Sequence, residues 1–303
     1  MIDLFILFRD NLLPIFLIGG AGYALGKVFK ITPRALSQVI FYIFSPALVF
    51  NLLINNDLND KDIVTTILFA TLLLLGVAAL TWLGGRLLKL DRKMMAAVLL
   101  TALFMNAGNY GLPVIDIAFG GTALTFATLF FVTSATYTYS AGVVIASSGH
   151  TSVLQAMKGL LRLPSIYALI LGLIVVRLGI VLPPYIERPV TMLSGASIPA
   201  MLVLLGLQFV NIKWDGQLRP LVMVSAIRLL VAPLLALGLA HLFGMTGPAY
   251  QATILEAGMP TAVLTTVLAT EFDCKPSFVT TVVIATTLLS PLTLTPLLYF
   301  LGA

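Results

Sequence analysis

The sequence predicts an all-α membrane protein of ten transmembrane helices, arranged as two inverted five-helix repeats. Three observations predict this architecture. The chain is 59% hydrophobic and only 10% charged over 303 residues, whereas soluble globular domains carry about 25% charged residues. Its apolar stretches reach the length of about 20 residues that a bilayer-spanning helix needs. The two halves of the chain also carry matching interruptions in corresponding apolar stretches.

Ten apolar stretches follow one another, joined by links that are often shorter than ten residues, so we expect no inserted soluble domain. The fourth and ninth stretches are interrupted near their middle by Asn, Gly and Pro. The predicted helices span residues 10–29, 35–54, 63–85, 94–120, 122–147, 163–181, 188–210, 219–243, 248–270 and 277–301.

Basic residues gather in alternate links, twelve in one set and four in the other. The positive-inside rule places the larger set in the cytoplasm, so both termini are predicted outside. Five spans per half then invert the second half relative to the first. We expect a first repeat at residues 1–148, a cytoplasmic link at 149–162 and a second repeat at 163–303. The start of the chain lacks the basic region of a cleavable signal peptide, so the first helix should be retained.

The two interruptions are Asn106–Pro113 (NAGNYGLP) and Glu256–Thr261 (EAGMPT). Backbone released from a helix at membrane depth is tolerated only where it lines protein or a watery cavity. A matched pair of broken spans is typical of the substrate site of a secondary transporter. Each break exposes helix ends with about half an elementary charge, and the positive ends suit an anionic group. The plainer alternative is two proline kinks without a ligand.

The candidate substrate-binding residues lie in the two breaks, with one arginine near the midplane of the eighth stretch. We expect Pro113 and Pro260 to stand where new helices begin, because a missing N–H costs nothing there. The set comprises Asn106, Asn109, Tyr110, Gly111, Pro113, Gly258, Met259, Pro260, Thr261 and Arg228.

Three charged residues stand out within the predicted spans, because a charge at the bilayer centre is costly and points to function. Arg228 is either a partner for the anion or half of a structural pair with Glu256 or Asp116. Glu256 is either a proton or sodium coupling site or a structural pair. Asp116, three residues past Pro113, either shares that role or complements the dipole of a helix start. No metal or cofactor is expected, and ion coupling stays open.

A polar run at 133–140 lies in the fifth stretch. Helical spacing puts Thr133, Thr136, Tyr137 and Ser140 on one face. These side chains either bond to neighbouring helices or line a cavity, with Tyr137 as a supporting residue of the site. No catalytic motif is present, so we do not expect an enzyme.

The order of these motifs resembles that of the auxin efflux carrier family. The resemblance rests on the two breaks, on Ser45–Leu48 (SPAL) and its echo Ile198–Met201 (IPAM), and on Arg228–Pro233 (RLLVAP). It implies a fold like that of bile-acid transporters and sodium/proton antiporters. Spans 1, 2, 6 and 7 would form a scaffold, and spans 3–5 and 8–10 a transport domain that moves as an elevator. The short link at 148–162 differs from the long loop of many plant carriers and favours a bacterial or archaeal permease.

The leading hypothesis is a multi-pass transporter of the cytoplasmic membrane that carries a small organic anion, either auxin-like or dicarboxylate-like. The second hypothesis is a sodium- or proton-coupled antiporter or exporter that uses Glu256 and Asp116. A membrane enzyme or sensor is the third and weakest. The expected partners are the anion and the lipid bilayer, and nucleic acid is not expected because the basic residues sit at segment ends. Gly22-x-x-x-Gly26 permits close helix packing, with or without a homodimer.

Overall fold

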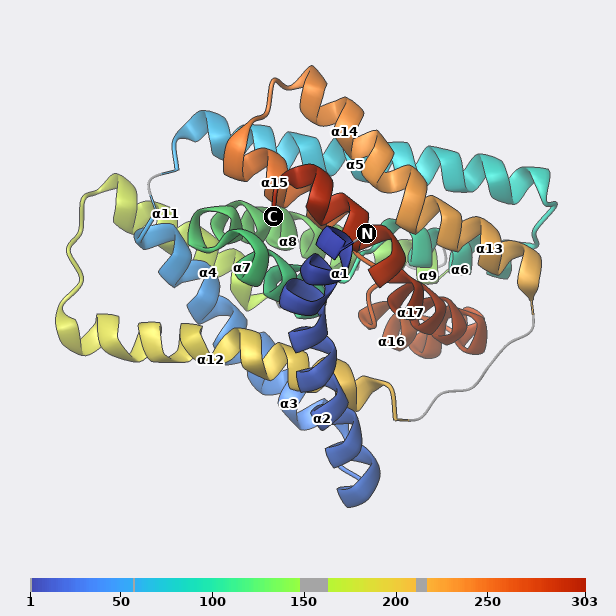
Figure 1. Ribbon diagram of the computed structural model, residues 1–303, viewed down its shortest axis with the longest axis horizontal. Helices are drawn as coiled ribbons and strands as arrows, with labels where there is room; N and C mark the ends of the chain where they lie inside the picture. Colours follow the sequence, from blue (N-terminus) through green and yellow to red (C-terminus); the bar gives the residue numbers. More distant parts are fainter. Residues whose placement is uncertain (1, 57, 148–162, 211–216) are drawn as a thin grey trace.

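The computed structural model describes residues 2–56, 58–147, 163–210 and 217–303, which are organised as α-helices and short π-helical turns (Figure 1). The all-helical class predicted from the sequence is confirmed for this part of the chain. The predicted cytoplasmic link at 149–162 lies outside the described residues.

Each of the first five predicted stretches contains helix. The elements are α1 (Ile2–Leu7), η1 (Phe8–Leu12), α2 (Leu13–Phe29), α3 (Pro33–Val39), η2 (Ile40–Phe44), α4 (Ser45–Ile54), α5 (Asp60–Leu87), α6 (Arg92–Leu103), η3 (Ala107–Gly111), α7 (Leu112–Phe119), α8 (Gly121–Tyr137), η4 (Thr138–Gly142) and α9 (Val143–Ala146). The first helix starts earlier than predicted, because Arg9 and Asp10 pair with each other (2.6 Å) and stay exposed within it.

The second half also contains helix in each predicted stretch. Its elements are α11 (Pro164–Arg177), α12 (Pro184–Gln208), α13 (Leu218–Ala226), η5 (Ile227–Val231), α14 (Ala232–Leu242), α15 (Gly247–Ala257), α16 (Leu264–Glu271) and α17 (Pro276–Leu301).

Seven helical runs of the described residues are long and apolar enough to cross a membrane, which makes this a multi-pass membrane protein. A shorter apolar helix, α11, lies between them, and the predicted fourth and ninth stretches are each split in two. The seven runs are Asp3–Phe29, Pro33–Ile54, Asp60–Leu87, Gly121–Ala146, Pro184–Gln208, Leu218–Leu242 and Pro276–Leu301.

Four of the π-helical turns end immediately before a helix whose second residue is proline: Pro14, Pro46, Pro113 and Pro233. Proline has no N–H, and its ring collides with the carbonyl four residues earlier. A wider turn before the proline relieves that collision without ending the helix. One of these turns, η5, contains Arg228.

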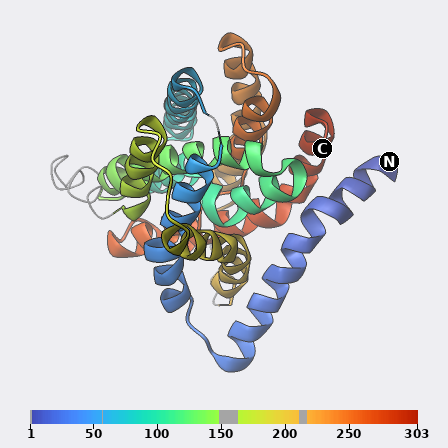
Figure 2. The same cartoon turned by 90° about the vertical axis from the view of Figure 1, so that its left-hand side faces the viewer.

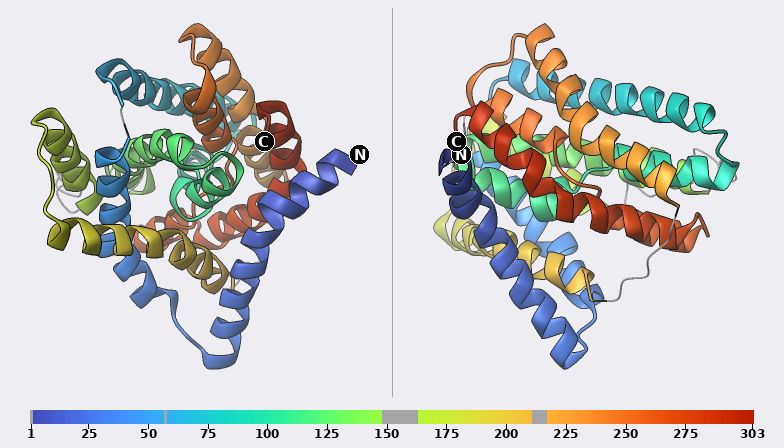
Figure 3. Two further views of the ribbon diagram at one scale, coloured as in Figure 1. Left: turned by 60° about the vertical axis from the view of Figure 1, so that its left-hand side comes forward. Right: turned by 45° about the vertical axis from the view of Figure 1, so that its right-hand side comes forward.

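Helices α2 and α12 approach each other through glycine. A Cβ on Gly206 would lie 2.7 Å from the backbone N of Tyr23, and a Cβ on Gly22 would lie 3.0 Å from the backbone carbonyl carbon of Val203. Small residues are what allows membrane helices to pack this closely. The α1–α2 run follows one edge of the molecule in Figures 2 and 3, and its start lies near the end of α17. The two termini therefore lie at the same end of the fold.

Candidate functional site

The two interruptions are extended segments between half-helices. In the first, α6 ends at Leu103 and helical backbone resumes at Ala107. In the second, α15 ends at Ala257 and α16 begins at Leu264. Pro260 therefore lies within the extended segment rather than at a helix start, because its backbone pairs with the other break. Pro113 does stand in the first turn of α7, as predicted.

The two extended segments cross and pair with each other. The N–H of Asn106 donates to the carbonyl of Pro260 (2.7 Å), and the N–H of Ala262 donates to the carbonyl of Phe104 (2.8 Å). These bonds form an antiparallel β-bridge between Met105 and Thr261, the sole isolated bridge in the described residues. Each break thus satisfies part of the backbone that the other has released, as buried polar groups require.

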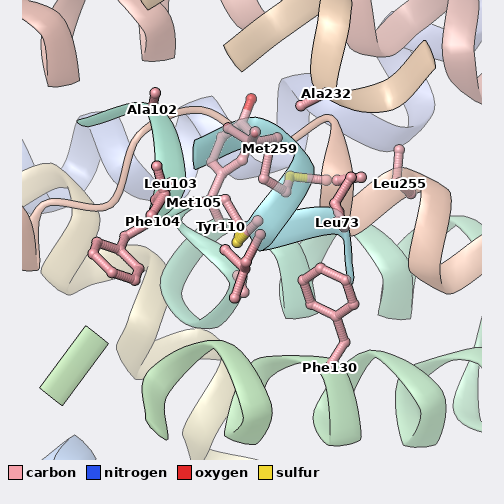
Figure 4. Close-up of a cluster of buried hydrophobic side chains, with 14 of the residues drawn as sticks. Leu73, Ala102, Leu103, Phe104, Met105, Tyr110, Phe130, Ala232, Leu255 and Met259 are labelled. Atoms are coloured by element: carbon pink, nitrogen blue, oxygen red, sulfur yellow. The ribbon is translucent and has the colours of Figure 1, made fainter. Parts of the chain in front are cut away.

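Buried side chains surround this crossing. Tyr110 and Met259 are completely buried and Met105 is 3% exposed, and Figure 4 shows them gathered where the broken segments meet. Thr261 ties the crossing to its neighbours, since its hydroxyl donates to the carbonyl of Thr101 (2.7 Å) and its N–H donates to the hydroxyl of Thr286 in α17 (3.1 Å). The crossing is therefore buried and is tied by hydrogen bonds to α6 and α17.

Arg228 caps the ends of two half-helices. Its side chain is fully buried, and its guanidinium donates to the carbonyl of Ala102 at the end of α6 (2.7 Å) and to that of Ala257 at the end of α15. The last carbonyls of a helix have no intrahelical donor and form the negative end of its dipole. One cation therefore serves two negative ends. No salt bridge joins Arg228 to Glu256 or Asp116 among the described residues; the guanidinium binds backbone carbonyls instead.

The carboxyl of Glu256 occupies the space that a side chain at Gly111 would fill. Glu256 is fully buried in the last turn of α15, and a Cβ added to Gly111 would lie 2.7 Å from its Cδ. Neither carboxyl oxygen has a hydrogen-bond partner in the described structure. Gly111 lies in the first turns of the half-helix that begins at Ala107 and continues into α7, so the carboxyl of Glu256 lies near the positive end of that half-helix.

A cavity of about 160 Å³ opens beside the crossing. Four groups of residues enclose it: Met105 to Asn109 from the first break, the start of α16, one face of α8 and η4, and parts of α3 to α4 and of α12. No charged side chain is among the described residues that line it. They are Ser37, Ile40, Phe41, Ser45, Met105, Asn106, Ala107, Gly108, Asn109, Phe131, Ser134, Ala135, Thr138, Tyr139, Met201, Leu204, Gln208, Ala262, Val263, Leu264 and Val267.

The first break supplies hydrogen-bond donors next to this cavity. Asn106 lines the cavity and is 5% exposed, and its side-chain Nδ2 is buried without a hydrogen-bond partner in the described structure. Helical bonding resumes when Tyr110 and Gly111 donate to the carbonyl of Asn106, at 3.3 and 2.9 Å. The preceding N–H groups belong to the unsatisfied start of a helix. Such a helix start together with an amide donor can hold an anionic group.

The predicted substrate residues divide into two groups. Asn106 and Asn109 line the cavity, whereas Tyr110 does not, because its hydroxyl bonds to Ser290 (3.0 Å) and its ring packs on Phe16. The remaining members lie at or next to the crossing but do not line the cavity: Gly111, Pro113, Gly258, Met259, Pro260, Thr261 and Arg228.

The supporting residues also lie away from the cavity. The hydroxyl of Tyr137 is 3.1 Å from that of Thr71 in α5. Asp116 is partly buried in the second turn of α7, so it does not stand at the helix start whose dipole it could complement. In the polar run, Thr133 and Thr136 donate to carbonyls of their own helix. The face that lines the cavity is the adjacent one, formed by Ser134, Ala135 and Thr138.

Sequence reasoning did not single out Gln208, Ser134 or Thr138 as site residues. Gln208 had a usable signal, since it is a lone amide at the end of an apolar span and follows Met201 and Leu204 at helical spacing. For Ser134 and Thr138, helical spacing in the polar run at 133–140 predicted the neighbouring face of the helix instead, because polar residues occupy every side of the helix there.

A pair of exposed charges links the two broken spans at their surface. The ammonium of Lys93, near the start of α6, lies 2.6 Å from the carboxylate of Asp273, just after α16. The Lys93 ammonium lowers the pKa of the Asp273 carboxyl, and that carboxylate raises the pKa of Lys93. Exposed pairs contribute little to stability, so the buried crossing holds these segments together.

The comparisons with known proteins agree with this architecture. A family model described as "Membrane transport protein" matches residues 8–298. The chain is 30% identical over 286 residues to an uncharacterized transporter of Methanothermobacter thermautotrophicus, covering 92% of this chain and 93% of the relative. It is 25% identical over 304 residues to an uncharacterized transporter of Methanocaldococcus jannaschii, covering 93% and 94%. Because the family model spans nearly the whole chain, this protein belongs to the membrane transport protein family, the auxin efflux carrier family that its motifs resemble.

Proposed function

We propose that this protein moves a small organic anion across the cytoplasmic membrane, as a secondary active or facilitative transporter. The observation that carries the proposal is the unpartnered amide donor of Asn106, which is buried at the cavity beside the start of a half-helix. A buried donor without an acceptor costs free energy. An anion bound there supplies the acceptor and meets the positive helix end.

The cavity limits the size of the cargo. Its volume is about 160 Å³, below the roughly 300–1,000 Å³ of pockets for drug-sized ligands. This favours a small organic anion.

The proposed transport movement depends on which helices line each side of the cavity. We propose ten spans in two inverted repeats, with α1–α4, α11 and α12 as the scaffold and α5–α9 and α13–α17 as the moving domain. Support comes from the joints within each group: Ser197 of α12 bonds to the carbonyl of Phe44 (2.7 Å), and Arg228 binds both broken spans. The cavity lies between the groups, so sliding one past the other would carry an anion across the bilayer.

Replacing Asn106 with alanine is expected to reduce uptake of the transported carboxylate by about 10- to 100-fold, the range of a hydrogen bond to a charged group. The fold should persist, because the side chain of Asn106 makes no capping bond. The measurement is uptake of radiolabelled short carboxylates into proteoliposomes at subsaturating concentration. Asn55→Ala is the matched control, because Asn55 is exposed at the end of α4. Equal uptake in both variants would remove the crossing from substrate binding.

A cation-coupled antiporter or exporter remains the second candidate, favoured by the carboxyl of Glu256, which is fully buried without a hydrogen-bond donor. In that mechanism Glu256 and Asp116 exchange protons or sodium. Glu256→Gln is then expected to abolish the dependence of uptake on an imposed pH or sodium gradient. The readout is uptake with each gradient applied separately. Parent protein that ignores both gradients excludes this candidate and leaves facilitative anion transport.

A further inference from the structure

A second cavity, of about 430 Å³, lies between α2, α12 and α17. Its volume is within the roughly 300–1,000 Å³ of pockets that bind small molecules and cofactors. Helix α17 contacts α1 and η1 just before α2 begins, and α2 itself packs on α12. We call the space between the three helices the α2–α17 groove. Its lining residues in the described part of the chain are Ile15, Phe16, Gly19, Gly20, Tyr23, Leu205, Gly206, Phe209, Ile284, Thr287 and Leu288.

The α2–α17 groove is apolar and opens toward the hydrocarbon of the bilayer. Its single threonine, Thr287, donates its hydroxyl hydrogen to the carbonyl of Val283 in its own helix (2.8 Å). At the rim, Leu288 is 66% exposed, and Leu17, next to the lining residue Phe16, is 64% exposed. Lipid tails are as apolar as leucine, so such side chains on the spans of a membrane protein contact acyl chains. The groove therefore fits an acyl chain.

A positive charge lies beyond one end of this groove. The stretch of α2 from Ile15 to Tyr23 covers about 12 Å along the helix axis, and Lys27 follows about 6 Å further. The ammonium of Lys27 lies 3.3 Å from the hydroxyl of Tyr23 and 5.6 Å from the centre of its ring. No salt bridge involves Lys27 among the described residues, and the sequence has no acidic residue between Asp10 and Asp57. The charge of Lys27 therefore has no carboxylate partner there.

The bilayer supplies an anionic group at this level. The positive-inside rule predicts that Lys27, with Lys30 and Arg34, lies at the cytoplasmic surface. The cytoplasmic leaflet contains anionic lipids, and basic pockets between transmembrane helices on that side bind their headgroups. A lysine near the end of a span also extends its ammonium to the headgroup level while its stem covers apolar surface.

We propose that the α2–α17 groove binds an anionic phospholipid of the cytoplasmic leaflet. One acyl chain lies between the three helices, and the phosphate meets the ammonium of Lys27. A zwitterionic phospholipid fits the same groove, but its headgroup carries a cation of its own beside the phosphate. The charge of Lys27 therefore selects the anionic lipid. This site is separate from the crossing, and its occupation does not depend on which anion is transported.

The test is native mass spectrometry of the full-length protein, stripped of lipid and titrated with phosphatidylglycerol or phosphatidylcholine that carry the same acyl chains. We expect one phosphatidylglycerol per chain, bound about 5-fold more tightly than phosphatidylcholine, the effect of one lysine at an anionic membrane surface. Lys27→Gln should bring the two lipids close to parity. Lys61→Gln, which removes an exposed lysine from the first turn of α5, should keep the preference. Equal affinities of the parent for both lipids would overturn the inference.

Gly20→Leu tests the groove itself. Gly20 lines the groove, and a Cβ there would meet nothing within 4 Å, so a leucine side chain can fill the space. We expect this variant to keep its Tm without lipid, because leucine favours a helix more than glycine does, and to lose the bound phosphatidylglycerol. Gly195→Leu is the matched control, since Gly195 is an exposed glycine of α12 with an equally open Cβ position outside the groove.

Three results would contradict a lipid in the groove. Gly20→Leu could retain phosphatidylglycerol as tightly as the parent does. Glycerol 3-phosphate, which has no acyl chain, could bind the parent as tightly as phosphatidylglycerol, so that the phosphate alone accounts for binding. The same spectra could also show a dimer that dissociates in Gly20→Leu, and a second copy of the chain would then be the occupant.

Discussion

Replacing Arg228 with methionine is expected to lower the Tm of the purified protein strongly and to remove most of its transport. The side chain is fully buried and holds the carbonyl ends of α6 and α15 through bonds to Ala102 and Ala257. Methionine has a similar length but no donor. The carbonyls that Arg228 now binds would be left buried and unpaired beside an apolar side chain.

The size of the effect follows from those carbonyls. Each unsatisfied buried acceptor costs about 1–3 kcal/mol, so two of them cost roughly 2–6 kcal/mol. Removing the buried cation recovers part of this, because the guanidinium no longer has to be desolvated. The ends of α6 and α15 stay in place, however, and the negative ends of both helices lose the guanidinium that they share. We therefore expect the loss to dominate.

Arg228→Lys provides the graded comparison, since it keeps the charge but lacks the planar fork that reaches two acceptors. Arg34→Met is the control for losing an exposed arginine in α3. Tm and carboxylate uptake are measured for all three. A native Tm and full uptake in Arg228→Met would refute the capping role. A native Tm with abolished uptake would instead support Arg228 as a direct ligand of the anion.

The helical class and the positions of the helices followed from hydropathy, because the bilayer permits few alternatives. Backbone groups must be satisfied within each span, so long apolar stretches could only be helices. The breaks were also legible, since Asn, Gly and Pro interrupt residues 106–113 and 256–261. Where the chain resumed its helix was less predictable. Pro260 was expected at a helix start, but its carbonyl pairs with Asn106 instead, and tertiary pairing of that kind leaves no local signal.

The candidate site was predicted less completely than the fold. The Asn, Gly and Pro residues in two apolar stretches placed the breaks near the middle of the membrane. Of the residues predicted there, Asn106 and Asn109 do line the cavity. Which side of the crossing each residue faces depends on how the two segments cross. Tyr110, adjacent to Asn109, therefore turns toward Ser290 and α17 rather than toward the cavity. Gln208 entered the site through the packing of α12, which a sequence pattern within one break cannot reveal.

Arg228 binds the carbonyl ends of α6 and α15, and the carboxyl of Glu256 lies against Gly111, one turn into the half-helix that begins at Ala107. The residues at the start of that half-helix, from Asn106 to Asn109, line the cavity. Its first N–H groups are therefore the positive end that is available to a ligand.

Replacing Gly111 with alanine is expected to destabilise the protein, against the usual helix preference. Gly111 has ordinary right-handed helical angles (φ −63°, ψ −55°), so no backbone constraint demands glycine. In an open helix, alanine would stabilise by about 1 kcal/mol. Here its Cβ would lie 2.7 Å from Cδ of Glu256, closer than real Cβ atoms approach. The carboxyl would have to move, and because Glu256 is fully buried it can do so only by displacing its neighbours. Overpacking of a buried site costs about 1–3 kcal/mol, so we expect a net loss.

Gly238→Ala gives the matched control, because that glycine lies in the middle of α14 and nothing approaches its Cβ position within 4 Å. It should hold or raise the Tm. The double variant Gly111→Ala/Glu256→Ala removes the colliding carboxyl, so the two substitutions should be less than additive, with a coupling of about 0.5–3 kcal/mol. Tm values of the four-member cycle measure this coupling. Strict additivity, or a Gly111→Ala protein as stable as Gly238→Ala, would mean that Glu256 does not occupy the space beside Gly111.

Uptake measured on the same variants distinguishes a packing role of the Glu256 carboxyl from a role in transport. Restored stability with restored uptake makes Glu256 a packing residue, whereas restored stability without uptake makes its carboxyl part of transport.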